Sequence, residues 1–340
     1  MKITHAELVR FEPRFAGGKA YVQSIAVQTK LYHSLLLITT EDGLTGTGEV
    51  VRFSDVREEE ADRMDVVTVK ELIGIELSDI PRLLADWNGR DRRYRSISFA
   101  LDCAWYDLLS QKSGLPVSTL LGGPAVGDVP EIFSLSAASV EETVASIFAN
   151  DGQAPVIQIK LGVDDLNTDM TCVREVLTVL RPNQLVLADF NGALNLDTAL
   201  KTIPTLSNPQ LIWEDPCKAY EDNVKVAQAL PSPMMIDSSL WGLDMISRAI
   251  ADGVQVVCIK PVKFGGLGVA RAARDMCLAA GMRIRIDGPW AGQHYAHAAL
   301  ALAIGAPADQ MIGSIDLTEP LETDHEMIAR PAPGRVGPAH

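Results

Sequence analysis

The sequence predicts an α/β fold in which a (β/α)8 barrel of the TIM type follows a smaller N-terminal α+β domain. The chain has 340 residues, more than the roughly 250 that a barrel alone requires. Strand-like alternation opens the chain, and from Val129 onward short apolar runs alternate with helical stretches. We therefore expect the first domain over residues 1–125 and the barrel over 126–316, with residues 317–340 packing back on the first domain.

The N-terminal domain opens with segments that alternate polar and apolar residues, and Glu41-Asp42-Gly43 is a turn signal between two of them. A helical pattern then runs from 55 to 113, with apolar residues at i, i+3, i+4 and i+7 within 96–109, and Gly114 ends it. A three-stranded meander followed by helices is the simplest arrangement. The predicted strand segments are Lys2–Phe11, Ser24–Gln28, Ser34–Thr40 and Thr45–Val50.

The barrel is predicted from eight short apolar runs, each followed by a polar break. The spacing between the last polar residues of successive runs, from 160 to 287, is 23 to 29 residues, which accommodates one strand, one helix and two loops. An open doubly wound sheet would usually carry a glycine-rich phosphate fingerprint after its first strand, and the sequence has none. The runs are Ile132–Ser136, Val156–Lys160, Leu185–Asp189, Leu211–Glu214, Met234–Asp237, Val256–Lys260, Arg283–Asp287 and Met311–Asp316.

Composition narrows the class of protein. Hydrophobic residues make up 47% and charged residues 22% of the chain, which is typical of a globular protein and excludes disorder as the main state. The formal net charge of -14 argues against nucleic-acid binding. Five widely spaced cysteines in apolar surroundings predict reduced core residues. Without a secretory leader or an apolar stretch of about 20 residues, we expect a cytoplasmic protein that does not enter membranes.

Several of the apolar runs end in an ionisable residue. The carboxyl ends of parallel barrel strands converge on one mouth, where active sites of this architecture lie. Any one of these residues could cap a helix or be solvated, but three consecutive carboxylate-ended strands between two lysine-ended strands form a pattern that chance explains poorly. The residues are Lys160, Asp189, Glu214, Asp237, Lys260 and Asp287.

The carboxylates Asp189, Glu214 and Asp237 predict a metal site, because crowded carboxylates repel one another unless a divalent cation lies among them. Oxygen ligands without paired histidine or cysteine favour Mg²⁺, with Mn²⁺ as a substitute. Asn191 either adds an oxygen to this site or forms an ordinary Asn-Gly turn, and both interpretations stay open.

A metal between two lysines suits removal of the proton alpha to a carboxylate. The cation stabilises the enediolate that forms, and it lowers the pKa of a nearby lysine so that this lysine can act as a base. We predict Lys160 and Lys260 as the acid–base pair on opposite faces of a small carboxylate substrate. Lys263, three residues further on, is expected to support the site or to be solvated.

These residues resemble the enolase superfamily, in its mandelate racemase and muconate lactonizing enzyme family. The similarity covers the helix at 100–109, Leu-Leu-Gly-Gly at 120–123, Trp-Glu-Asp-Pro at 213–216 and the segment from Lys260 to Gly-Gly-Leu at 265–267. It implies an N-terminal capping domain over the barrel, the three metal ligands and two lysines predicted above, and a homo-oligomer. The two-lysine arrangement resembles the branch of racemases, epimerases, cycloisomerases and hydroxyproline-processing enzymes.

The chain departs from the family pattern at Gln158, where the strand-two signature Lys-x-Lys has its first lysine, and at Ser238, where a glutamate is frequent. Gln158 can donate a hydrogen bond to a substrate carboxylate but supplies no charge. The segment from Asp287 to Trp290 resembles the hydroxyproline branch and favours a proline-like or other small amino-acid substrate. The predicted substrate contacts are Gln158, Asn191, Lys263, Asp287, Trp290 and Tyr21.

The resemblance places specificity in the capping loop at 12–22, with Gly17 and Gly18 as hinges. His294 and His297 do not replace the strand-six lysine, and a substrate contact and a structural role are equally open for them. Further candidate contacts in the capping domain are Phe15, Lys19, Arg52 and Phe53.

Three functions are compatible with these residues. The first is a racemase or epimerase, in which the two lysines exchange a proton on opposite faces of the substrate. The second is a dehydratase, in which one lysine abstracts the proton and a β-hydroxyl leaves. The third is a non-catalytic ligand-binding barrel, for which the missing first lysine at Gln158 would be the sign.

Overall fold

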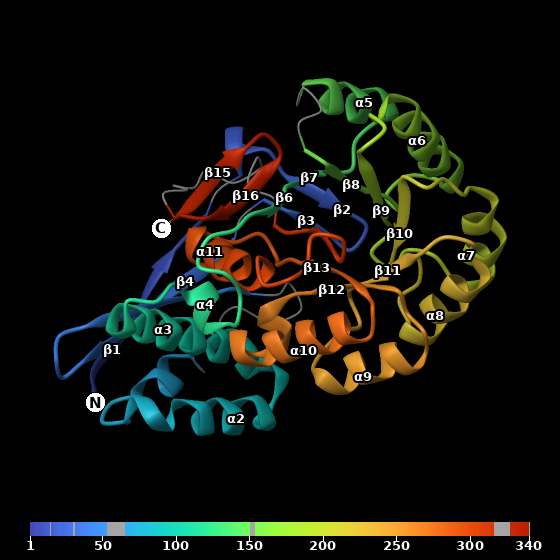
Figure 1. The fold of residues 1–340 in the computed structure, drawn as a ribbon. Helices are drawn as coiled ribbons and strands as arrows, with labels where there is room; N and C mark the ends of the chain where they lie inside the picture. The colour runs from blue at the N-terminus through green and yellow to red at the C-terminus, as the bar shows by residue number, and fades with distance from the viewer. Residues whose placement is uncertain (14, 30, 53–64, 150–153, 316–326, 340) are drawn as a thin grey trace.

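Eight parallel strands run side by side through the part of the chain after residue 131 (Figure 1). The protein is represented by a computed structural model that describes residues 1–340 except 14, 30, 53–64, 150–153, 316–326 and 340. Each strand pairs with the next along the chain, so the sheet order follows the sequence. The strands are β7 (Ile132–Leu135), β8 (Val156–Lys160), β9 (Leu185–Asp189), β10 (Leu211–Glu214), β11 (Met234–Ile236), β12 (Val256–Ile259), β13 (Arg283–Ile286) and β14 (Met311–Gly313).

A helix follows each strand from β7 to β13 and lies on the outside of the sheet (Figure 1). All eight predicted apolar runs form these strands, and the predicted barrel is confirmed. The helices are α5 (Val140–Ala149), α6 (Leu166–Val179), α7 (Leu196–Thr202), α8 (Tyr220–Ala229), α9 (Leu243–Ala251), α10 (Leu267–Ala279) and α11 (Gln293–Ala303), with 3₁₀ turns η4 (Ile203–Thr205) and η5 (Pro261–Phe264).

The first and last strands of the barrel come together at Gly313. The backbone N–H of Ser314 donates to the carbonyl of Pro130 at 3.2 Å, just before β7. A Cβ atom at Gly313 would lie 2.8 Å from Cγ1 of Ile132, so glycine permits this close approach. Inside the barrel a small apolar cluster, which includes Val156 and Met235, fills the end away from the ionisable residues.

The N-terminal domain is an antiparallel sheet in the order β1-β4-β5 packed against helices. The predicted meander is therefore present, with the hairpin β2-β3 inserted between its first two strands as a separate sheet. The elements are β1 (Ile3–Phe11), η1 (Ala16–Gly18), β2 (Tyr21–Gln23), β3 (Ala26–Gln28), β4 (His33–Thr40), β5 (Thr45–Val50), η2 (Leu77–Asp79), α2 (Ile80–Arg90), η3 (Arg92–Tyr94), α3 (Arg95–Ser113) and α4 (Val117–Leu120).

Helix α3 joins the N-terminal sheet to the barrel. Ala100 and Ala104 lie in the core of the N-terminal domain, whereas Phe99 and Cys103 lie in the core between the barrel strands and their helices. Asp102, on the same helix, accepts a hydrogen bond from the backbone of Gly268 in the first turn of α10 at 2.9 Å. One helix thus serves two cores, which fixes the N-terminal domain on the barrel.

The C-terminal residues form a hairpin beside the start of the barrel. Strands β15 (Ile328–Ala332) and β16 (Arg335–Pro338) form a three-stranded sheet with β6 (Val129–Pro130), and β16 also packs against α11. Arg335 contacts Asp128 at 3.0 Å and Arg330 contacts Glu131 at 3.4 Å. The division at 125/126 and the packing of 317–340 on the first domain stay predictions, and part of the latter segment lies outside the described residues.

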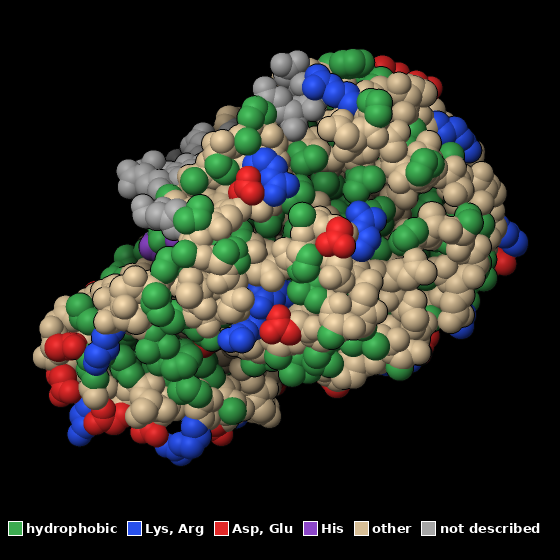
Figure 2. Space-filling model, viewed as in Figure 1, with side chains coloured by type: hydrophobic (Ala, Val, Ile, Leu, Met, Phe, Trp, Pro, Cys, Tyr) green, Lys and Arg blue, Asp and Glu red, His purple; other side chains and the backbone are tan. Residues whose placement is uncertain are grey.

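Acidic and basic side chains are interspersed over the face shown in Figure 2. The five cysteines are all buried and form no disulfide, in agreement with their apolar sequence context. No helix in the described part of the chain is both long and apolar enough to cross a membrane.

Candidate active site

The six ionisable residues predicted from the strand ends meet at one mouth of the barrel. Lys160, Asp189 and Glu214 end β8, β9 and β10, while Asp237, Lys260 and Asp287 directly follow β11, β12 and β13. The ammonium of Lys160 is 2.5 Å from Oδ2 of Asp189, and that of Lys260 is 2.6 Å from Oδ2 of Asp237. Each predicted acid–base lysine therefore contacts a predicted metal ligand.

The carboxylates control the pKa of both lysines. Burial lowers the pKa of the Lys160 ammonium, but the charges of Asp189 and Glu214 and the hydrogen bond to Asp189 outweigh burial and raise it. Burial likewise lowers the pKa of Lys260, while Asp237 and Asp287 raise it well above its usual range. A divalent cation that took over the carboxylate charge would offset these contributions and favour the neutral amine that a base requires.

Asp237 is held by two lysines. Besides Lys260, the ammonium of Lys263 donates to Oδ1 and to the backbone carbonyl of Asp237, both at 3.0 Å, and to the carbonyl of Ser238 at 3.3 Å. Burial would raise the pKa of Asp237, but the two lysines hold it well below its usual range. These contacts use the three N–H donors of Lys263, and its predicted contact with a substrate stays a prediction.

Glu214 is flanked by a neutral donor on one side and a cation on the other. The amide of Gln158 donates to Oε2 of Glu214 at 2.8 Å, and Nη1 of Arg285 lies 3.9 Å from the same oxygen. Burial and the charges of Asp189 and Asp237 raise the pKa of Glu214 well above its usual range, although Arg285 opposes them. Carboxylates that lie this close together attract a cation strongly.

Two residues of the site were missed by reasoning from the sequence. Arg285 is 2% exposed, and its Nη2 lies 3.0 Å from Oδ2 of Asp287. Asp215, beside Glu214, accepts hydrogen bonds from the backbone of Ser238 at 2.6 Å and of Asp237 at 3.3 Å. Strand alternation could have shown that Arg285 and Asp287 face the same way, whereas nothing in the sequence connects Asp215 to residue 238.

Backbone conformation also singles out this end of the barrel. Among the described residues, two that are not glycine have a positive φ, Asn191 at 47° and Asp215 at 38°. Asp215 directly follows the predicted ligand Glu214, and Asn191 lies two residues after the predicted ligand Asp189. Strained backbone conformations of this kind cluster at functional sites. Burial and the charge of Asp237 raise the pKa of Asp215 to about 6.

The donor set fits a hard divalent cation. Asp189, Glu214 and Asp237 lie on adjacent strands, and Oδ1 of Asn191 is buried without a hydrogen-bond partner among the described residues. As the described side chains stand, no three carboxylate, histidine or cysteine groups converge closely enough to coordinate an ion. Asp189 and Asp237 also accept hydrogen bonds from Lys160 and Lys260, at 2.5 Å and 2.6 Å.

A hairpin of the N-terminal domain lies over the mouth. Val22 exchanges hydrogen bonds with Ser136 and Ala137 beyond β7, and Ser24 donates to the carbonyl of Phe190 beyond β9. These contacts place β2-β3 across the strand ends that carry Lys160 and Asp189. The predicted capping arrangement is thereby present in this part of the chain.

Three aromatic rings form a cluster where the N-terminal domain meets the mouth of the barrel. The rings of Tyr21 and Trp290 are 4.9 Å apart edge to face, and Phe15 lies 6.4 Å from Tyr21 and 6.5 Å from Trp290. Tyr21 also contributes to the electrostatic field at Lys160, which places it close to the predicted base. This cluster joins the capping loop to the segment after β13.

The other candidates have the following surroundings. Lys19 is exposed, Arg52 pairs with Asp65, and Nδ1 of His297 contacts the carbonyl of Met327 at 3.0 Å. His294 is half-buried in the first turn of α11. Phe53 lies outside the described residues.

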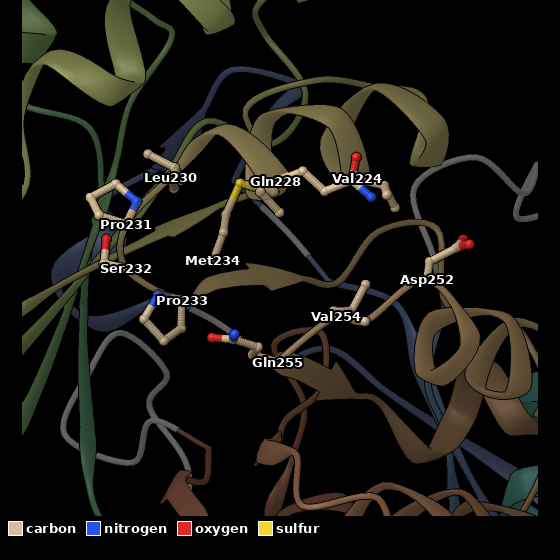
Figure 3. A pocket seen from close by; sticks show the side chains of 12 residues that line it. Val224, Gln228, Leu230, Pro231, Ser232, Pro233, Met234, Asp252, Val254 and Gln255 are labelled. Atoms are coloured by element: carbon tan, nitrogen blue, oxygen red, sulfur yellow. The ribbon is translucent and has the colours of Figure 1, made fainter.

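A pocket occurs at the opposite end of the barrel (Figure 3). Its lining includes Gln228, Pro231, Met234, Asp252 and Gln255, which lie around the amino ends of β11 and β12. Because this end carries none of the predicted chemistry, the pocket does not belong to the site.

Comparison with known proteins identifies the class. Residues 139–335 match the family described as enolase C-terminal domain-like, and residues 12–122 match the mandelate racemase / muconate lactonizing enzyme N-terminal domain. The chain therefore belongs to the mandelate racemase/muconate lactonizing enzyme family of the enolase superfamily, as its motifs predicted. It is an enzyme of the class that abstracts a proton alpha to a carboxylate.

Individual relatives differ in their reactions. A cis-3-hydroxy-L-proline dehydratase of Roseibium aggregatum is 30% identical over 239 residues, or 69% of this chain and 64% of that protein. A mandelate racemase/muconate lactonizing enzyme of Roseovarius nubinhibens ISM superposes with a TM-score of 0.88 at 25% identity, covering 99% of this chain and 92% of the other. A dipeptide epimerase of Enterococcus faecalis V583, complexed with Mg and L-Leu-L-Tyr, shares the fold at 21% identity, a TM-score of 0.84 and coverage of 93% and 90%.

Proposed function

We propose that this protein is a Mg²⁺-dependent racemase or epimerase of a small amino-acid-like carboxylate. The observation that carries the proposal is the position of two lysines, Lys160 at the end of β8 and Lys260 after β12. Four strand positions separate them in an eight-stranded barrel, so they face each other across the mouth. A substrate between them presents one face of its alpha carbon to each lysine, which is what inversion requires.

The side chains then divide the work. When bound, a divalent cation supplies electrostatic stabilisation for the negative charge that develops on the substrate carboxylate. Asp189, Glu214 and Asp237 would hold it, with Asn191 beside them. Lys160 removes the alpha proton from one face as the free amine, and Lys260, as the ammonium, returns a proton to the other. In the reverse direction the two lysines exchange these roles.

Formal charges support an anionic substrate. The site contains five carboxylates and, with Lys160 as the free amine, three cationic groups. A divalent cation therefore changes its formal charge from -2 to 0 and removes the repulsion that a carboxylate substrate would otherwise meet. The carboxylates are Asp189, Glu214, Asp215, Asp237 and Asp287, and the cationic groups are Lys260, Lys263 and Arg285. The aromatic cluster of Phe15, Tyr21 and Trp290 favours an apolar side chain or ring on that substrate, and a proline-type ring is the form we propose.

The test is exchange of the alpha proton in D₂O. Wild-type protein with Mg²⁺ is incubated with amino acids, proline, hydroxyproline and their N-methylated derivatives and followed by ¹H NMR. We expect loss of the alpha-proton signal with inversion, and a decrease of about 10²–10⁴-fold in Lys160→Ala and in Lys260→Ala. Lys201→Ala, at an exposed lysine paired with Asp197, is the matched control and should exchange at the wild-type rate.

A second candidate is a dehydratase, favoured by the 30% identity to the cis-3-hydroxy-L-proline dehydratase. In that reaction one lysine abstracts the alpha proton while the β-hydroxyl leaves with a proton, so water is lost. The same NMR assay separates the two, because a β-hydroxy substrate would give an unsaturated product that tautomerises rather than the opposite stereoisomer. Only one of the two lysines would then be essential for proton abstraction.

Binding of Mg²⁺ without exchange of any substrate would instead support the non-catalytic barrel. A homo-oligomer and a cytoplasmic location stay predictions, and the assembly can be measured by light scattering on purified protein.

A further inference from the structure

Gln158 lies beneath the predicted metal ligands and contacts two of them. It is 4% exposed, and its Nε2 donates to Oε2 of Glu214 at 2.8 Å and to Oδ2 of Asp189 at 3.4 Å. An amide nitrogen carries two hydrogens, and both are used in these contacts. No N–H of Gln158 is left for a substrate carboxylate.

The orientation of this amide is fixed by a third residue. Ser134, on the neighbouring strand β7, donates its hydroxyl to Oε1 of Gln158 at 3.0 Å, and the two residues are directly paired in the sheet. When Glu214 and Asp189 are ionised, as they are as ligands of a cation, they only accept hydrogen bonds, so a flipped amide would aim its oxygen at them and lose both contacts. Serine and carboxylates therefore select the same orientation.

We propose that Gln158, oriented by Ser134, is a positioning residue that holds Glu214 and Asp189 in place for the divalent cation and does not bind the substrate. This inference rests on the divalent cation of the proposed function and not on its reaction or substrate. Residues that hydrogen-bond to metal ligands reduce the motion of those ligands before binding, and their loss typically lowers metal affinity by 10–100-fold. Since glutamine is neutral, it restricts these carboxylates without repelling the cation.

The two roles of Gln158 predict different results. A residue that positions metal ligands changes the affinity for Mg²⁺ itself, without any substrate present. A residue that binds the substrate carboxylate changes only KM and leaves Mg²⁺ binding unaffected. Measuring Mg²⁺ alone therefore separates them and requires no knowledge of the substrate.

The experiment is calorimetric titration of Mg²⁺ into the purified full-length protein. We expect Gln158→Leu to lower Mg²⁺ affinity by about 10–100-fold. Ser134→Ala should cause a smaller decrease, because the amide keeps its donors but loses the partner that orients it. Gln158→Asn keeps the polarity but shortens the side chain, and should resemble Gln158→Leu if reach to Glu214 is what matters.

Gln184→Leu is the matched control. Gln184 is 3% exposed and donates to the carbonyl of Ala154 at 2.8 Å, at the amino ends of the strands and away from the metal ligands. Its loss should reduce thermal stability and leave Mg²⁺ affinity at the wild-type value. If folded Gln158→Leu binds Mg²⁺ as tightly as wild type, the positioning role of Gln158 is wrong and the proposed function is unaffected. If wild type binds no Mg²⁺, the Mg²⁺ dependence in the proposed function is wrong.

Discussion

The carboxylate of Glu49, on β5, accepts the backbone N–H of Gly292 at 2.6 Å, immediately before α11 of the barrel. Its other oxygen accepts the N–H of Tyr295 at 3.1 Å, and His33 lies 2.8 Å from the first. Glu49 is 1% exposed. A side chain of the N-terminal sheet thus caps a barrel helix and fixes the segment that carries Trp290.

We expect Glu49→Ala to lower the free energy of unfolding by about 2–4 kcal/mol, because the buried N–H groups of Gly292 and Tyr295 and the His33 ring lose their partner. Glu49→Gln keeps an acceptor and should cost less. Urea denaturation measures both effects. The control is Glu7→Ala, at an exposed residue of β1, which should change the free energy of unfolding by no more than about 0.5 kcal/mol. Equal effects of Glu49→Ala and Glu7→Ala would contradict the capping role.

Close packing of α3 on β5 makes a second prediction. A Cβ atom at Gly48 would lie 1.9 Å from the carbonyl oxygen of Ala100, so Gly48→Ala must push the helix away. We expect a loss of about 3 kcal/mol in the free energy of unfolding. Gly89, within α2, has no heavy atom near that position, and Gly89→Ala should stabilise the protein by about 0.5–1 kcal/mol. Opposite changes in melting temperature are the expected result.

The pH dependence of stability should contain a contribution from Asp102. Burial raises its pKa to about 6 from an ordinary value of 3.8, despite the hydrogen bonds from Gly268 and Leu267. Because the folded-state pKa is the higher one, the folded state resists ionisation of this carboxyl. Its contribution to stability therefore falls as the pH rises from about 4 to about 6, and is constant above.

Asp102→Asn removes this ionisation and keeps an oxygen that can accept from Gly268. We expect the variant to gain up to about 3 kcal/mol relative to wild type at pH 7.5, with the gain shrinking toward pH 4. Urea denaturation across this range measures the difference. A gain that does not vary with pH would rule out ionisation of Asp102 as its source.

Loss of Arg285 should destabilise the barrel. It contacts Asp287 at 3.0 Å and lies near Glu214 in a buried layer, so Arg285→Met leaves carboxylates without their cation. We expect a cost of about 3–5 kcal/mol. Arg283→Met is the matched control, because Arg283 lies on the same strand, is half-buried and has no ion-pair partner among the described residues of the site. It should cost less than about 1 kcal/mol.

A double-mutant cycle gives the stricter comparison. If Arg285 acts through Asp287, then Asp287→Asn should reduce the cost of Arg285→Met, because the uncompensated charge is gone. Additive costs would show that the two side chains do not interact energetically.

The sequence by itself determined the barrel, through its alternation of apolar runs and helical segments. The apolar runs form strands that are buried on both faces, and this burial requires helices to cover the outside of the sheet. The same periodicity determined that Lys160, Asp189 and Glu214 reach one mouth, since parallel strands end on the same side. Both are local properties of the chain, repeated along it, and the sequence contains them in full.

Only the tertiary structure decided how these side chains pair. Glu49 and Tyr295 are 246 positions apart, and Gln158 contacts both Glu214 and Ser134, which lie on two different strands. In the sequence Arg285 cannot be distinguished from an ordinary strand residue, and only the closed arrangement of the strands places it beside Glu214. Such contacts depend on where whole elements meet, and their strength depends on burial, which raises the energy of charges and directs each donor to a particular acceptor.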